Sequence, residues 1–131
     1  MAGIFTRIIN GEIPCYKIAE DERFFAFLDI HPLSKGHTLV IPKQETDYLF
    51  DLKPELLGEL MQFAQKVAHA LKKSIDCKRI GVVVMGLEVP HAHIHLIPMN
   101  SEADMNFSRP KLTLSVEEFT TLAYQISSNL T

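Results

Sequence analysis

One stretch of the chain, residues 54–75, has an apolar pattern that a long helix would bury along one side. Its apolar residues recur at steps of three and four positions: Leu57, Leu60, Met61, Ala64, Val67, Ala68, Leu71 and Ile75. This spacing places them in a single stripe on a helix surface. Pro54 suits the first turn, where its missing N–H costs no helical hydrogen bond. The remainder of the chain must therefore supply a layer on which this helix packs.

Strand-like segments lie on both sides of the predicted helix. Before it, residues 16–19, 23–29 and 37–41 are short and rich in aromatic or β-branched side chains, which is typical of strands. After it, the β-branched run 79–85 predicts a buried strand, and residues 91–98 predict another. Strands grouped early and late, with helices over them, indicate an α+β fold with a mainly antiparallel sheet.

Two further helices are expected at the ends of the chain. Residues 4–9 have helical spacing and stop at the turn pair Asn10-Gly11. Ser115-Val116-Glu117-Glu118 forms a capping box, followed by a helix whose apolar face comprises Phe119, Leu122, Ala123, Ile126 and Leu130. Between the last strand and this helix, the polar stretch up to Leu114 is expected to be mobile. Residues 1–131 are therefore interpreted as a single domain with a long packed helix and a C-terminal helix.

Composition narrows the classes of function. The chain has 131 residues, 47% hydrophobic and 22% charged, and a net charge of −3, as in a soluble globular protein. No basic field exists for non-specific nucleic-acid binding, although a local site could still hold a small phosphate-bearing ligand. Cys15 and Cys77 are far apart and are expected to be free thiols. No signal peptide or membrane-spanning run is recognised, so a cytoplasmic protein is expected, without nucleic-acid or membrane partners.

Residues 91–97, His-Ala-His-Ile-His-Leu-Ile, carry the strongest chemical signal. Alternate side chains of a strand share a face, so His91, His93 and His95 should line one side. Neighbouring rings would then start about 6.6 Å apart along the strand. Burying three adjacent imidazoles without a task is costly, and this favours a functional cluster.

Two chemistries suit this spacing. Histidines two positions apart on a strand can share a metal ion, although such sites usually recruit a carboxylate or a cysteine as well. Alternatively, a neutral imidazole can attack phosphorus as a nucleophile, while flanking imidazoles orient it and move protons. The spacing by itself does not choose between them.

This strand resembles the defining motif of the histidine triad (HIT) family, His-φ-His-φ-His-φ-φ with φ apolar, at every position from His91 to Ile97. The resemblance extends to residues 4–14, to Phe27-Leu28-Asp29-Ile30-His31-Pro32 and to residues 36–43, which occur in the family's order. It implies a nucleotide-binding protein that, when active, cleaves or transfers nucleoside monophosphates at the α-phosphorus.

The resemblance also implies roles for four histidines. His93 would be the nucleophile that forms a nucleotidyl-histidine intermediate, and His95 would contact the α-phosphate. His91 would hold His93 in the correct tautomer, and His37 would complete the site from a neighbouring strand. His31 and His69 have no family role and are interpreted as surface residues.

The same resemblance places the nucleoside. Asp29 would accept hydrogen bonds from the ribose hydroxyls, and four apolar residues would enclose the base: Phe5, Ile8, Phe27 and Ile30. Plain core packing explains these four equally well.

Two departures from the family pattern are informative. Where many bacterial members carry zinc-binding Cys-x-x-Cys and a histidine, this chain has residues 3–6, Gly-Ile-Phe-Thr, and Glu45, so no structural zinc is expected. Before the triad, only residues 85–90 stand where the family has a longer loop with phosphate-contacting amide and hydroxyl groups. Glu88 in this loop would either donate a proton, if its pKa were raised, or repel phosphate if ionised.

These observations lead to one expected function and two alternative hypotheses. The chain is expected to be a homodimeric, metal-independent hydrolase without a cofactor, acting on a purine nucleoside phosphoramidate or a dinucleoside polyphosphate. The short loop motivates the alternative of a nucleotide-binding module with little or no turnover. The third hypothesis is a metal-dependent hydrolase built on His91, His93 and His95.

Overall fold

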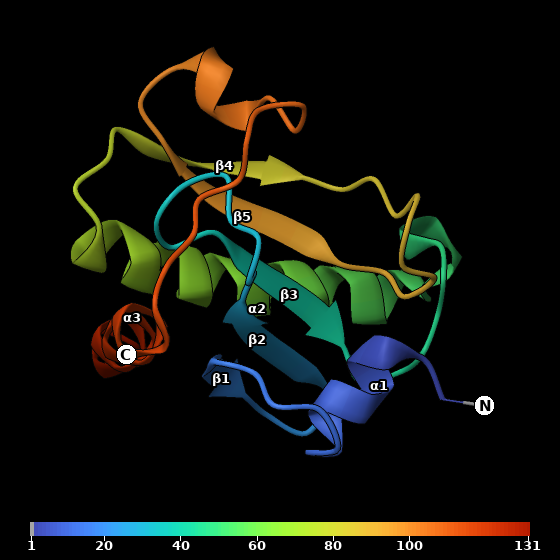
Figure 1. Ribbon diagram of the computed structural model, residues 1–131. Coiled ribbons are helices and arrows are strands. Elements are labelled where there is room, and N and C mark those ends of the chain that lie inside the picture. The colour runs from blue at the N-terminus through green and yellow to red at the C-terminus, as the bar shows by residue number, and fades with distance from the viewer. Residues whose placement is uncertain (1) are drawn as a thin grey trace.

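The computed structural model describes residues 2–131 and contains five strands, three α-helices and two short 3₁₀ helices in that range (Figure 1). In chain order these are α1 (Ile4–Ile9), β1 (Lys17–Glu20), β2 (Phe24–Leu28), β3 (Thr38–Pro42), η1 (Leu49–Asp51), α2 (Pro54–Ser74), β4 (Arg79–Val83), β5 (Ile94–Met99), η2 (Glu102–Met105) and α3 (Val116–Ser128). The predicted helices and strands are thus all present, with ends shifted by a few residues.

The strands form one sheet in the order β1-β2-β3-β5-β4, and every neighbouring pair is antiparallel. The expected α+β class with an antiparallel sheet is confirmed. β3 and β5 lie side by side although α2 and β4 separate them in sequence, and Leu39 faces His95 across this pair. This pairing brings the segment around residue 37 next to the triad.

The two faces of the sheet pack against different helices. Phe24, Ala26 and Leu28 of β2 point into the main core, where α2 and α3 cover the sheet. The alternate residues Phe25 and Phe27 point to the opposite face and join a smaller cluster with α1. The period of two along β2 therefore separates a helix-covered face from a second face that remains partly open.

The predicted buried strand over residues 79–85 is wrong in two respects. β4 ends at Val83, and it is an edge strand in which Val82 remains 52% exposed. A β-branched run indicates extended backbone, but burial depends on which neighbours the topology supplies. Here β4 pairs with a neighbouring strand, β5, along only one of its two edges.

The triad segment also differs from expectation. β5 begins at Ile94, so only His95 of the triad lies within the strand; before it, the N–H of Ala92 donates to the carbonyl of Thr46. Within residues 100–114, whose mobility stays a prediction, η2 forms with Ser101 and Asp104 as a capping box. The capping box at Ser115 is present as predicted.

Among the helices of residues 2–131, none combines the length and the apolar character needed to cross a membrane.

Candidate active site

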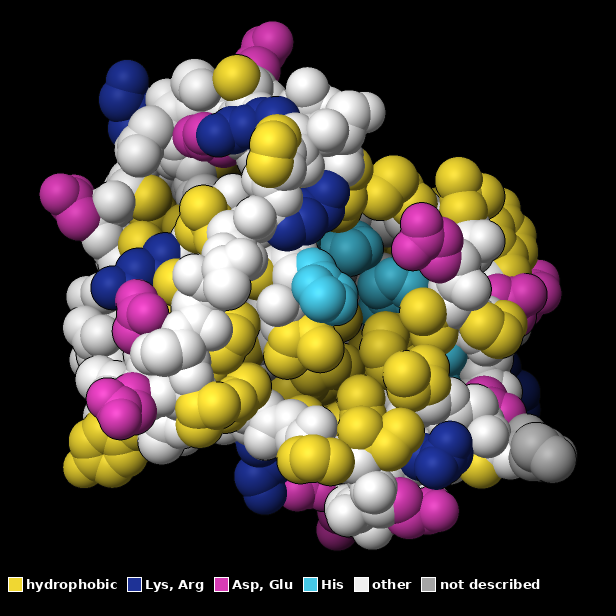
Figure 2. All heavy atoms as spheres, in the orientation of Figure 1, with side chains coloured by type: hydrophobic (Ala, Val, Ile, Leu, Met, Phe, Trp, Pro, Cys, Tyr) yellow, Lys and Arg dark blue, Asp and Glu magenta, His cyan; other side chains and the backbone are white. Residues whose placement is uncertain are grey.

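Four histidines come together on the face of the sheet that carries α1. Figure 2 shows histidine side chains gathered in one region of this face, with apolar side chains below and basic side chains above. His37, His91, His93 and His95 are all buried. His31 and His69, interpreted from sequence as surface residues, are exposed.

The ring of His93 is held by a main-chain acceptor. Its Nδ1 lies 2.6 Å from the carbonyl oxygen of His91, so Nδ1–H donates and Nε2 keeps its lone pair. The contact expected between His91 and His93 therefore comes from the main chain of His91 and not from its ring. The His91 ring instead donates from Nε2 to the Pro42 carbonyl at 2.8 Å. In the neutral ring, the lone pair of His93 therefore lies on Nε2, away from the His91 carbonyl.

A chain of hydrogen bonds determines the tautomers of His37 and His95. The N–H of Leu33 donates to Nδ1 of His37 at 3.0 Å, so the proton of this neutral ring lies on Nε2. That Nε2–H donates to Nδ1 of His95 at 2.9 Å. His95 must therefore carry its own proton on Nε2. This ring consequently offers a hydrogen-bond donor beside the lone pair of His93, since the two ring centroids are 5.0 Å apart.

Burial keeps three of these rings neutral. It lowers the pKa of His37 to about 3 and that of His95 to about 4, and the charges of neighbouring imidazoles add to the effect. Burial likewise lowers the pKa of His91. The cluster can therefore offer lone pairs and N–H donors near neutral pH, but these three rings supply no positive charge there.

Asp29 lies at the edge of the histidine cluster. Its Oδ1 accepts from the N–H of His31 at 2.8 Å, and its Oδ2 is 3.5 Å from Nε2 of His37. Because His37 is neutral, this second contact is not an ion pair. Burial raises the pKa of the Asp29 carboxyl. The carboxylate is partly exposed, so its oxygens can still accept hydrogen bonds from a ligand.

The four apolar residues assigned to the base separate into two groups. Phe5, Ile8 and Phe27 are buried in the cluster beneath α1, whereas Ile30 is 56% exposed. The Phe5 ring meets the rings of His91 and His93 edge to face, with centroids 5.6 and 5.2 Å apart. Core packing thus accounts for the first three, and Phe5 among them also borders the triad.

Three side chains of the kinds that bind metal ions lie close together. One ligand atom each from Asp29, His37 and His95 lies within 4.8 Å of the other two. A metal bound to Nε2 of His37 would displace its proton to Nδ1, where it would face the N–H of Leu33. Two donors would then oppose each other in a buried position. The donor set fits a hydrogen-bonded relay and does not fit a metal ion.

Glu45 forms two hydrogen bonds that connect α1 to the loop after β3. Its Oε1 accepts from the N–H of Gly3 and the hydroxyl of Thr6, both at 2.7 Å. These two bonds join the loop after β3 to the helix that carries Phe5. The position that departs from the family's zinc pattern thus makes a direct hydrogen-bonded contact with residues 3–6.

Glu88 lies in the loop between β4 and the triad, and its side chain is exposed. The loop is short, and its end approaches the triad through the N–H of His91, which donates to the carbonyl of Val89 at 2.8 Å. Glu88 is thus an exposed residue three positions before His91, in a loop whose end is hydrogen-bonded to the start of the triad.

Two residues near the histidines had no role in the sequence interpretation. The Phe107 ring lies edge-on to His95, with centroids 5.1 Å apart, and the charge of Lys111 counteracts part of the rise that burial causes in the pKa of Asp29. Both belong to the segment that was expected to be mobile. Phe107 could have been noticed as an aromatic residue in a polar segment. Nothing in the local sequence indicated a role for Lys111, because Asp29 is about 80 residues away.

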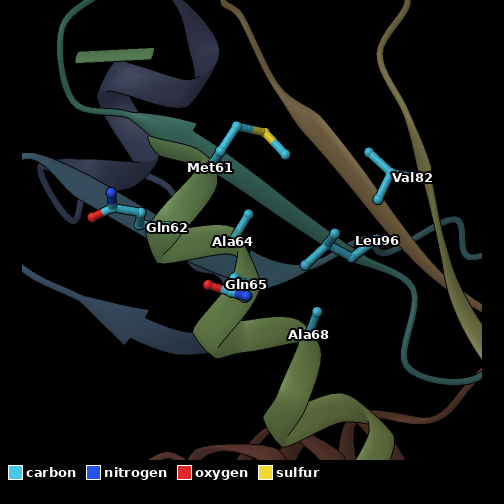
Figure 3. Close-up of a pocket in the computed structure, with 7 residues that line it drawn as sticks. All are labelled: Met61, Gln62, Ala64, Gln65, Ala68, Val82 and Leu96. Atoms are coloured by element: carbon cyan, nitrogen blue, oxygen red, sulfur yellow. The ribbon is translucent and has the colours of Figure 1, made fainter. Parts of the chain in front are cut away.

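A groove of about 370 Å³ lies away from the histidines, between α2 and the edge of the sheet (Figure 3). Its lining is mostly apolar and comes from α2, β4 and β5: Met61, Gln62, Ala64, Gln65, Ala68, Val82 and Leu96. Leu96 points to the side of β5 opposite His95, so this groove is not part of the histidine site.

Comparison with known proteins agrees with this geometry. The HIT domain family model matches residues 10–102. An adenosine 5′-monophosphoramidase of Schizosaccharomyces pombe is 36% identical over 99% of both chains, and an uncharacterised HIT-like protein of Borreliella burgdorferi is 39% identical over 97% of both. The crystal structure of a HIT-like protein from Bartonella henselae matches with a TM-score of 0.83 and 32% identity, covering 98% of this chain and 96% of the other. With the histidine motif, the fold and the matched domain in agreement, the chain belongs to the HIT family.

Proposed function

We propose that this protein hydrolyses a purine nucleoside 5′-phosphoramidate or a dinucleoside polyphosphate at the α-phosphorus, with His93 as the nucleophile. The observation that carries the proposal is the 2.6 Å bond from Nδ1 of His93 to the His91 carbonyl, which places the lone pair of the neutral ring on Nε2. The adenosine 5′-monophosphoramidase of S. pombe, similar along the whole chain, supports the phosphoramidate as the first substrate to test.

The reaction proceeds in two displacements. The lone pair on Nε2 of His93 attacks the α-phosphorus while the bond to the leaving group breaks, and that group departs with the bonding electrons and a proton from solvent. The Nε2–H of His95 stabilises charge that develops on a phosphate oxygen. Water then attacks phosphorus and gives up a proton to solvent, the electrons of the Nε2–P bond return to His93, and nucleoside monophosphate is released.

The nucleoside is proposed to lie between Asp29 and the wall formed by α1. The partly exposed carboxylate of Asp29 accepts hydrogen bonds from the ribose hydroxyls. Ile30 covers one side of the base, and the buried rings of Phe5 and Phe27 support the wall from behind. No metal or cofactor takes part in this scheme.

The experiment that tests the proposal is release of AMP from adenosine 5′-phosphoramidate by the wild type and by His93→Ala. The variant should lose at least about a thousandfold in kcat, because the nucleophile is gone. Its circular dichroism spectrum should be unchanged. His69→Ala, on the exposed side of α2, is the matched control and should retain activity. Wild-type turnover by His93→Ala would refute the mechanism.

The short exposed loop of residues 86–90 supports one alternative function, a nucleotide-binding module without turnover. Calorimetry with AMP and GMP, beside hydrolysis assays with phosphoramidates and dinucleoside polyphosphates, separates the two. Binding without hydrolysis of any of these substrates would favour the module.

We also propose that the protein forms a homodimer through β4. An uncovered edge strand presents free main-chain donors and acceptors, which proteins usually protect. Val82, Val84 and Met85 are exposed on and after this strand, beside the apolar groove of Figure 3. A second copy placed against this edge would cover both features.

A further inference from the structure

The segment of residues 106–112, here named the strap, crosses the histidine site. The half-buried ring of Phe107 meets His95 and His37 edge to face, with centroids 5.1 and 6.1 Å away. At the other end of the strap, the N–H of Leu112 donates to the carbonyl of Pro32 at 2.9 Å. Both ends of the strap are therefore anchored beside the loop that connects Asp29 to His37.

Lys111 is held in a defined position on this strap. Its Nζ donates to the carbonyl of Phe107 at 2.5 Å and to the carbonyl of Arg109 at 3.2 Å. An ammonium group has three N–H donors, so one remains for another acceptor. Lys111 also directly precedes Leu112, whose main chain is bonded to the loop after Asp29.

Lys111 differs from two other basic residues in the groups that its side chain contacts. Arg109 on the same strap pairs with Asp104 at 3.1 Å, and Lys43 at the end of β3 pairs with Glu20 at 2.8 Å. The acceptors of Lys111 are two neutral carbonyls, which leave its charge uncompensated. Burial raises the pKa of Asp29 and lowers that of His37; the Lys111 charge counteracts part of the first shift and adds to the second, so its field reaches the site.

A nucleotide would need such a charge. A phosphate monoester carries about −1.5 to −2 at neutral pH. The rings of His37, His91 and His95 are kept neutral by burial, and Asp29 contributes a negative charge once ionised. An anion placed beside His95 would therefore face N–H dipoles and a carboxylate unless a cation lies nearby.

We propose that Lys111 is a phosphate-binding residue of this site, which brings a positive charge to the phosphate of the bound nucleotide from the strap beside His95. This inference rests on the proposed function, since it names the group that neutralises the nucleotide's charge. It assigns recognition of the anion to a residue outside the triad and outside the loop that precedes the triad.

The test measures binding of AMP and of adenosine, which lacks the phosphate, by calorimetry at low and high salt. Lys111→Met should weaken AMP binding about fivefold at low salt, the upper range for an exposed charge pair. It should leave adenosine binding unchanged, and the difference from the wild type should shrink at high salt. Lys111→Arg, which keeps the charge, should bind AMP as the wild type does.

Lys35→Met is the matched control, because it removes one exposed lysine from the loop before β3 whose charge acts on Glu118 of α3. It should bind AMP normally. Unchanged AMP binding by Lys111→Met would overturn the inference, and so would an equal loss of adenosine binding, which would indicate a purely structural role of the strap. A wild type that binds no AMP would overturn the proposed function and this inference with it, whereas the other two outcomes leave the proposed function standing.

Discussion

Nε2 of His37 lies 2.9 Å from Nδ1 of His95, and this contact joins two rings that are 58 positions apart in sequence. Because the Leu33 N–H occupies the other nitrogen of His37, protons can be assigned along the whole chain of bonds. In the proposed mechanism His37 therefore acts through His95 as a positioning residue, and its role can be tested separately from that of His93.

Two substitutions of His37 test this relay. A glutamine side chain reaches about as far as Nε2 of histidine, whereas asparagine reaches only about as far as Nδ1. His37→Asn should lower kcat about tenfold, less than the roughly hundredfold typical of a donor that touches the transition state itself. His37→Gln can still donate to His95 and should remain close to the wild type. Equal activities of the two variants would contradict the relay.

Acid should destabilise the folded protein through the same buried rings. The pKa of His37 falls from its ordinary value of 6.5 to about 3 in the folded state, and that of His95 to about 4. Between about pH 6.5 and 4 the unfolded chain therefore binds more protons than the folded one. The free energy of unfolding should fall through this window by about 1.4 kcal/mol per pH unit for each fully buried histidine.

Urea unfolding across this pH range checks the expectation. Both His37→Gln and His37→Asn lack the titrating ring, so both should show a shallower pH dependence than the wild type. The same slope in wild type and variants would show that His37 does not titrate as proposed.

Removing the Glu45 carboxylate should loosen α1. Glu45→Ala loses both acceptors for Gly3 and Thr6, so amide hydrogens of residues 4–9 should exchange faster with solvent. Since Phe5 of this helix packs against His91 and His93, KM for the phosphoramidate should also rise. Glu45→Gln retains a side-chain oxygen acceptor and is the control. Unaltered exchange in Glu45→Ala would mean that the apolar contacts of α1 suffice.

The purified protein should be active without a bound metal ion. The Leu33 N–H makes Nε2 of His37 a donor, which removes a ligand from the Asp29, His37 and His95 set. Elemental analysis should find far less than one equivalent of zinc or iron, and a chelator should leave turnover unchanged. Stoichiometric metal with chelator-sensitive activity would instead support the metal-dependent hydrolase.

A charge on the edge strand should prevent association. Val82→Glu places a carboxylate on the exposed face of β4, and light scattering should find a monomer where it is expected to find a dimer for the wild type. Val116→Glu, at an exposed valine that begins α3, is the matched control and should remain dimeric. A wild type that is monomeric at all concentrations would refute the homodimer.

Local patterns predicted the elements of this fold well. The steps of three and four residues over 54–75 and the capping box at Ser115 each depend on neighbours within a few positions, and both are present in the structure. Burial of β4 could not be predicted in this way. Its side chains suit a strand, but its place at the sheet edge follows from the order of all five strands.

The sequence by itself determined that three histidines alternate with apolar residues, and therefore that the chain carries a cluster of imidazoles on one face of an antiparallel α+β fold. Only the tertiary structure decided how these rings are protonated, because the groups responsible are main-chain atoms: the His91 carbonyl for His93 and the Leu33 N–H for His37. It also brought Phe107 to the site and the residue after Lys111 to the loop that follows Asp29, through a ring contact and a main-chain hydrogen bond between distant segments. Main-chain donors and acceptors are the same at every residue, so no pattern of side chains can reveal where the fold will place them.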